Sequence, residues 1–96
     1  MEGVGVGMIR KIYKYNLMPG DNVVKIEACE KIMGVENQNG NIVVYAMVND
    51  TFGTVNTYKF LVVGTGWNII DDMTQYKFLG TVNQYDRGLM WHVFYK

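Results

Sequence analysis

The sequence predicts an all-β domain: a compact, mostly antiparallel sheet or sandwich of about seven short strands, with at most one short helical turn. Val, Ile, Tyr and Phe fall in runs of about six residues, and glycine- and asparagine-rich segments separate these runs, as is typical of strands and turns. No segment keeps a helical period of apolar residues over three turns. The expected strands span residues 9–15, 22–28, 31–38, 41–48, 57–63, 76–82 and 89–95.

The composition of three strands predicts their place in the fold. Residues 9–15 carry Arg10, Lys11 and Lys14 among apolar residues, which suits an exposed sheet edge. Residues 41–48 and 57–63 are apolar on nearly every position, so both of their faces are expected to be buried. In so small a domain, burial on both faces favours a partner chain, and we expect a homo-oligomer.

The firmest local prediction is a hairpin at QNGN, residues 38–41. Asn-Gly supplies the two positive-φ residues that a type I′ turn requires. Counting outward from a two-residue loop places Val35 opposite Val44 on one face and Gly34 opposite Tyr45 on the other. A tyrosine beside a strand glycine covers the backbone that the glycine leaves bare.

The last hairpin is predicted by analogy with the first. If Val82 pairs with Leu89, Gly80 faces Trp91 in the way that Gly34 faces Tyr45. The intervening segment NQYDRG, residues 83–88, is long enough to shift this register.

Length and charge limit the domain and its partners. A chain of 96 residues forms one domain, which we expect over residues 9–96, with the glycine-rich residues 1–8 as a disordered or tag-like extension. Lys plus Arg equals Asp plus Glu at nine each, so no net charge would attract nucleic acid or an anionic membrane. No apolar run approaches the roughly 20 residues that cross a bilayer, and no signal peptide is visible. Cys29 is the only cysteine, which excludes an intramolecular disulfide and indicates a half-buried apolar residue in a reducing cytosol.

The segment VGTGWNII, residues 63–70, resembles a nucleotide-binding glycine loop only in part. A dinucleotide fingerprint needs a third glycine where Ile69 stands, and a helix that NIIDDMTQY is too short and too β-branched to form. Two alternatives remain. The segment is a tight turn with Trp67 packed back on the core, or it is a ligand-contacting loop in which Trp67 stacks on a ring and backbone N–H groups approach a phosphate.

Catalytic chemistry finds little support in the sequence. His92, the only histidine, alternates with Met90 and Phe94 along a strand, which favours a half-buried imidazole with a hydrogen bond. Asp71 and Asp72 point apart on an extended chain, so we assign them to solubility or to capping a helical turn over residues 72–75. We therefore predict no enzyme activity, no cofactor and no metal site.

Aromatic residues are more numerous than one small core needs, at 14% of the chain. They fill the core and an oligomer interface, or some of them form a stacking pocket for a planar ligand. The segment 83–88 offers a second ligand loop, in which Arg87 would meet a phosphate beside Asn83, Gln84 and Tyr85. The candidate ligand-binding residues of both loops and the last strand are Thr65, Gly66, Trp67, Asn68, Tyr85, Arg87 and His92.

Several short sequence motifs along the chain resemble those of a family of small uncharacterised β-rich proteins of bacteriophages and prophages. These motifs are IYKY, ENQNGNIVVYAMV, the GTG corner (residues 64–66), FLGT and GLMWHVF, in that order over residues 9–94. The glycine-rich start before Met8 departs from the pattern. The resemblance implies a phage origin, a compact β fold and a place in the cytoplasm of the bacterial host, but no catalytic residues.

A phage origin favours a binding function. The first hypothesis is a counter-defence sponge, an oligomer that sequesters a nucleotide-derived immune signal of the host, such as a cyclic ADP-ribose variant. The second is a protein-binding inhibitor that offers a sheet edge or an aromatic patch to a host protein. The third is a minor structural or accessory protein without a ligand.

Overall fold

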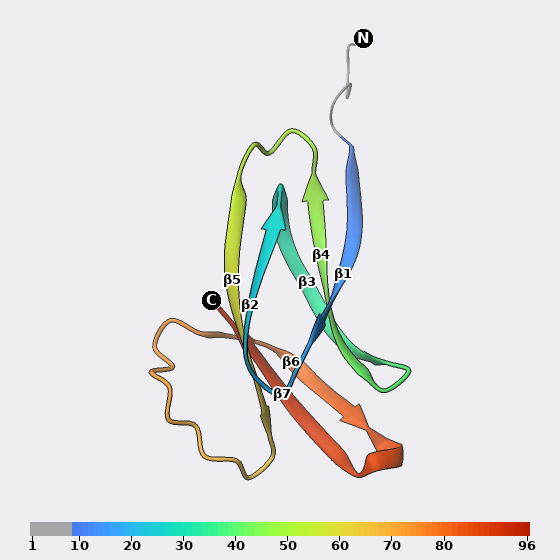
Figure 1. Ribbon diagram of the computed structural model, residues 1–96, viewed down its shortest axis with the longest axis vertical. Helices are drawn as coiled ribbons and strands as arrows, with labels where there is room; N and C mark the ends of the chain where they lie inside the picture. Colours follow the sequence, from blue (N-terminus) through green and yellow to red (C-terminus); the bar gives the residue numbers. More distant parts are fainter. Residues whose placement is uncertain (1–8) are drawn as a thin grey trace.

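The computed structural model describes residues 9–96, so the expected extension over residues 1–8 lies outside the described residues. All seven expected strands form (Figure 1). One turn of 3-10 helix, η1, precedes the last strand. The elements are β1 Arg10–Leu17, β2 Gly20–Glu27, β3 Cys29–Gln38, β4 Asn41–Asn49, β5 Val55–Gly64, β6 Lys77–Gln84, η1 Tyr85–Arg87 and β7 Leu89–Tyr95.

The strands form two antiparallel sheets, which confirms the predicted all-β class. The smaller sheet has the order β1-β4-β3 and the larger has the order β2-β5-β7-β6. The basic strand β1 lies at a sheet edge, as its composition predicts. The sheets meet where β3 contacts β6. Gly80 permits this approach, because a Cβ atom there would lie only 3.0 Å from Cγ1 of Val35.

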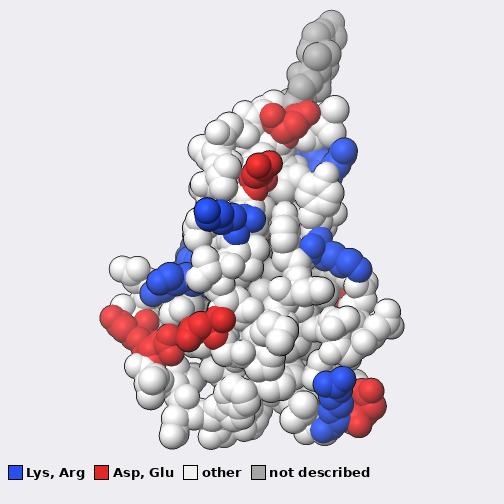
Figure 2. Space-filling model, viewed as in Figure 1, with Lys and Arg blue, Asp and Glu red and all other residues white. Residues whose placement is uncertain are grey.

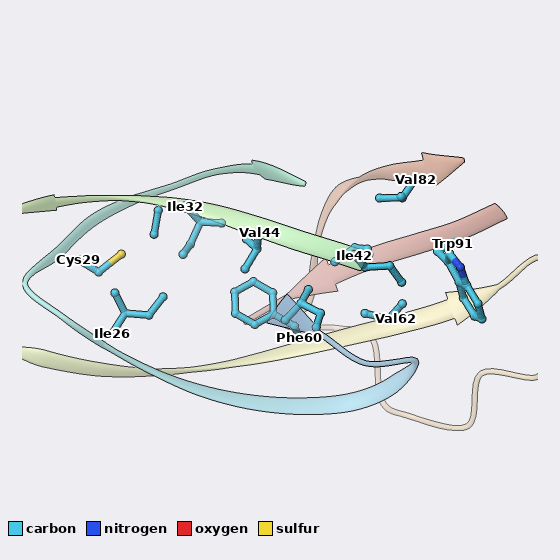
Figure 3. Packing of buried hydrophobic residues seen from close by; sticks show 12 residues of the cluster. Ile26, Cys29, Ile32, Ile42, Val44, Phe60, Val62, Val82 and Trp91 are labelled. Atoms are coloured by element: carbon cyan, nitrogen blue, oxygen red, sulfur yellow. The ribbon is translucent and has the colours of Figure 1, made fainter. Parts of the chain in front are cut away.

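The core lies between the two sheets and draws on alternate residues of their strands (Figure 3). Val43, Leu61 and Val63, which alternate with core residues, are buried too. The predicted burial of both faces is therefore confirmed for part of β4 and β5, whereas Thr57 and Lys59 of β5 are exposed. Cys29 is an apolar core residue, as predicted, although it is fully buried rather than half-buried. Two of the three strands that lie inside their sheets, β4 and β5, supply much of the core through Ile42, Val44, Ala46, Phe60 and Val62.

The β3–β4 hairpin has the predicted turn and register. Asn39 and Gly40 have φ angles of 52° and 87°, which are the left-handed values that a type I′ turn requires. Val35 pairs with Val44, and Gly34 pairs with Tyr45.

The predicted register of the β6–β7 hairpin is wrong by two residues. Leu89 pairs with Gln84, so Trp91 faces Val82 and Gly80 faces Val93. The cause lies in the turn, because β6 continues to Gln84 and residues 85–87 form a tight 3-10 turn. Gly88 closes this turn with a φ of 64° and donates its N–H to the Tyr85 carbonyl at 3.1 Å. Trp91 therefore does not cover Gly80 and instead packs against Trp67.

Residues 72–75 lie in a loop and do not form the helical turn that was one of the two alternatives for Asp71 and Asp72. Asp72 instead accepts the Thr74 N–H at 3.1 Å through Oδ1, and the Tyr76 N–H bonds the Met73 carbonyl at 3.1 Å. This backbone hydrogen bond from Thr74 holds the pKa of Asp72 below its usual value. The one helical turn of the described chain is η1, which the sequence analysis treated as a loop.

Candidate functional site

Four connections meet at one end of the sandwich, which we call the loop end. β1, β3, β5 and β6 end there, and β2, β4 and β7 begin there (Figure 1). A hollow of about 190 Å³ opens among the β1–β2 turn, the β3–β4 turn and the β6–β7 turn. Its lining residues are Leu17, Met18, Pro19, Gly40, Asn41, Ile42, Gln84, Arg87, Leu89 and Trp91.

A second hollow of about 230 Å³ adjoins the first and brings in the GTG corner. Leu89 and Trp91 line both hollows. Pairing of β5 with β7 sets this arrangement, because it places Gly64 opposite Trp91 and lets the Thr65 N–H reach the Met90 carbonyl at 3.3 Å. The lining residues of the second hollow are Gly64, Thr65, Trp67, Gly88, Leu89, Met90 and Trp91.

Trp67 folds back over the corner and also remains accessible. Its ring meets the Trp91 ring edge to face, with centroids 5.3 Å apart and planes at 89°. Gly64 makes room for it, because a Cβ atom there would lie 2.8 Å from Nε1 of Trp67. The side chain is nevertheless 51% exposed. The two alternatives for this segment therefore combine, since a packed tight turn presents a half-open indole to a hollow.

Trp91 is fixed in place by a hydrogen-bonded chain that crosses between the two sheets. Its Nε1–H donates to Oε1 of Gln84 at 2.9 Å, and Nε2 of Gln84 donates to the Gly40 carbonyl at 2.9 Å. Gln84 is buried, so its bond to Trp91 is shielded from competing water, whereas its bond to Gly40 borders the open hollow. Gln84 belongs to the second candidate ligand loop, but its amide is engaged within the protein.

Arg87 supplies the positive charge of the loop end. Its guanidinium lies beside the β3–β4 turn, with Nη2 3.7 Å from the position that a Cβ atom of Gly40 would take. The only ion pair among residues 9–96 joins Arg10 to Glu30, so Arg87 has no acidic partner in the described chain. A guanidinium at the wall of a hollow can bind a phosphate or a carboxylate through two parallel hydrogen bonds.

His92 lies outside both hollows and holds the corner to the sheet. Oγ1 of Thr65 is 2.7 Å from Nε2, and Oγ1 of Thr81 is 3.1 Å from Nδ1. Both ring nitrogens of the half-buried imidazole are therefore engaged, in agreement with the structural role that its position in the strand predicts.

The structure brings together only part of the predicted site. Thr65, Trp67 and Arg87 line the hollows, whereas Gly66, Asn68 and His92 do not. Gly66 instead enables the turn, with a φ of 87°. Tyr85 is 84% exposed on η1 and lines neither hollow. Five further lining residues were not predicted: Leu17, Met18, Gly40, Leu89 and Trp91. The apolar ones lie on strands or beside them, where the sequence does not distinguish a pocket-lining residue from a core residue. Gly40 was assigned only to its turn.

Metal-binding clusters and membrane-spanning helices are both absent from residues 9–96. Residues 9–96 contain no group of three or more His, Cys, Asp or Glu side chains placed to hold a metal ion. Over that range there is also no helix of the length and apolar character needed to cross a bilayer.

Fold and site together define a small β-sandwich with adjoining aromatic hollows at its loop end. Residues 8–96 match the model of a family described as a domain of unknown function, DUF7352. The chain therefore belongs to this family. No curated protein and no solved structure matches it.

Proposed function

We propose that the protein is a small binding protein that holds a nucleotide-derived ligand at the loop end. The observation that carries the proposal is the joining of Trp67, Trp91 and Arg87 around two adjoining hollows. A half-open indole offers a stacking surface for a base, and an unpaired guanidinium offers a bidentate site for a phosphate. A nucleotide carries both of these groups within the reach of one binding site.

Binding without chemistry is the simplest role for this arrangement. His92, the only histidine, is hydrogen-bonded through both ring nitrogens to threonine hydroxyls, and Gln84 is bonded within the protein. The remaining wall is largely apolar, which suits recognition of a ring.

The resemblance to small phage proteins supports a biological role for such binding. We propose that the protein is a counter-defence sponge, which sequesters a nucleotide-derived immune signal in the cytoplasm of an infected bacterium. A cyclic ADP-ribose variant combines a purine with a diphosphate and fits this description chemically.

A thermal-shift screen tests the proposal. The panel is AMP, ADP-ribose, a cyclic ADP-ribose and cyclic dinucleotides, each at about 1 mM. A ligand present at about 100 times its Kd adds about 2.7 kcal/mol to the free energy of unfolding, which is a shift of about 10 °C or more for a domain of this size. Arg87→Gln and Trp67→Ala should reduce the shift.

The matched control is Arg10→Gln, because Arg10 is the other arginine and pairs with Glu30 on β1. This variant should keep the full ligand-induced shift. The proposal is wrong if no member of the panel shifts the wild-type transition, or if the shift survives in both loop-end variants.

A second candidate function is inhibition of a host protein through a sheet edge. β1 is an edge strand of the smaller sheet, and Ile12 and Tyr13 on it are exposed. An unpaired edge with exposed apolar side chains can receive a strand from another protein. A host protein captured by the wild type but not by a Tyr13→Pro variant, with no nucleotide response, would favour this function.

A further inference from the structure

Each hollow at the loop end is too small for the proposed ligand. Ligand pockets in proteins usually enclose about 300–1,000 Å³. The two hollows measure about 190 and 230 Å³, and both are open to solvent. One chain can therefore hold a base in one hollow and a phosphate in the other, but it leaves the outer side of a nucleotide open to solvent.

Apolar side chains surround the mouths of these hollows. Met18 is 69% exposed, and Trp67, Leu89 and Met90 are exposed beside it. In Figure 2 the charged side chains at the lower end of the molecule are confined to one basic and acidic pair at the lower right, and the rest of this end is uncharged on the face shown. Single exposed apolar residues are common, but a contiguous group around a hollow is typical of an interface.

We propose that a second copy of the chain completes the site. Two copies meet loop end to loop end about a two-fold axis, and the ligand lies between them. The ligand class is a molecule with two phosphate groups, such as a cyclic dinucleotide, with one phosphate at each Arg87. This inference rests on the proposed function and adds the partner, the symmetry and the number of phosphates.

The charge of the loop end explains why a second copy would need the ligand. A two-fold contact places the same surface of each copy opposite itself, so the two Arg87 guanidiniums approach each other. Neither has an acidic partner within residues 9–96, and the neighbouring Asp86 lines neither hollow. Like charges in an apolar interface repel strongly. Two phosphates between the guanidiniums replace this repulsion with charge-assisted hydrogen bonds.

Sedimentation velocity and titration calorimetry test the inference on the full chain. The probes are cyclic di-AMP and cyclic di-GMP, which carry two phosphates, and AMP, which carries one. We expect a monomer without probe, a dimer with a cyclic dinucleotide, and a stoichiometry of one probe per two chains. AMP should bind at least about tenfold more weakly and leave the protein monomeric.

Two exposed apolar residues provide matched variants. Met18→Glu introduces a charge at the rim of the loop end and should lower the dimer fraction at saturating probe by at least about fivefold. Val55 is exposed at the start of β5, at the opposite end of the sandwich, and Val55→Glu should leave the dimer fraction unchanged.

The outcomes separate the inference from the proposed function. Binding of one probe per chain to a monomer would overturn the inference and leave the binding function in place. A dimer that forms equally well without probe would overturn the ligand-dependent closure. Absence of binding by every nucleotide in the panel would overturn both.

Discussion

Replacement of Gln84 by leucine should be among the most damaging single changes to the loop end. Gln84 is 4% exposed, and its amide satisfies two groups at once, the Trp91 indole N–H and the Gly40 carbonyl, each at 2.9 Å. Leucine has a similar volume but neither donates nor accepts a hydrogen bond. The variant therefore removes the polar link between the β6–β7 hairpin and the β3–β4 turn while it keeps the space filled.

The magnitude follows from the two groups left without partners. A buried polar group without a partner costs about 1–3 kcal/mol. Gly40 borders an open hollow, where water can bond its carbonyl. We therefore expect the free energy of unfolding to fall by about 2–4 kcal/mol in total. At about 4–8 °C per kcal/mol for a domain of this size, the melting temperature should fall by about 8–32 °C.

Urea unfolding followed by far-UV circular dichroism measures this loss. The matched control is Gln75→Leu, because Gln75 is exposed in the loop between β5 and β6 and should change the free energy of unfolding by less than about 0.5 kcal/mol. A loss below about 0.5 kcal/mol in Gln84→Leu would refute the reasoning, because the two hydrogen bonds would then contribute nothing.

Three further predictions concern the turns and the smaller sheet. Gly64→Ala should push Trp67 off its packed position, since the new Cβ would lie 2.8 Å from Nε1, and the tryptophan fluorescence maximum should move to the red. Gly40→Ala should cost about 1 kcal/mol in chemical denaturation, because Gly40 has a φ of 87° and alanine is strained there although it meets only an ordinary contact. Hydrogen bonds from Asn49 and then Arg10 hold the pKa of Glu30 below its usual value, so its contribution to stability is present above about pH 4.5 and is lost as the pH falls through the lowered pKa. Glu30→Gln should therefore lose less stability than the wild type between pH 6 and pH 3 in urea titrations, and an equal loss would contradict this assignment.

The part of the fold that the sequence predicted well is set by local chemistry. Asn39 and Gly40 allow one tight turn type, and a two-residue loop then fixes the register of β3 and β4 residue by residue. Runs of β-branched and aromatic residues between turn segments located all seven strands, because the requirement to bury one or both faces acts on each strand separately.

The β6–β7 register could not be predicted in the same way. NQYDRG contains no residue pair that selects one turn, and its first two residues extend β6 while the next three form η1. A six-residue connection accommodates several registers, and only the packing of Val82, Trp91 and Val93 into the core chooses among them. The error of two residues kept the correct faces inward because side chains alternate with a period of two.

Single residues of the candidate site were predicted from the sequence, but their proximity in the fold was not. Trp67 and Arg87 were singled out because an exposed loop tryptophan and a rare arginine are chemically suited to a ligand. Their convergence depends on β7 lying between β5 and β6, which is a contact between distant segments that no local pattern specifies. The structural role of Gln84 was not predicted for a related reason, because its polarity does not reveal that the fold buries it between two sheets.

The measurement that tests the central claim most directly is a titration followed by the indole N–H signals in a two-dimensional ¹⁵N–¹H NMR spectrum. The chain has two tryptophans, and both lie at the loop end, so the indole region reports on the proposed site alone. We predict that both signals move in a saturable manner with a nucleotide of the panel, while backbone signals of residues 50–54 at the opposite end stay in place. Indole signals that remain unchanged at millimolar nucleotide, or a response confined to the opposite end, would contradict the assignment of the loop end as the binding site.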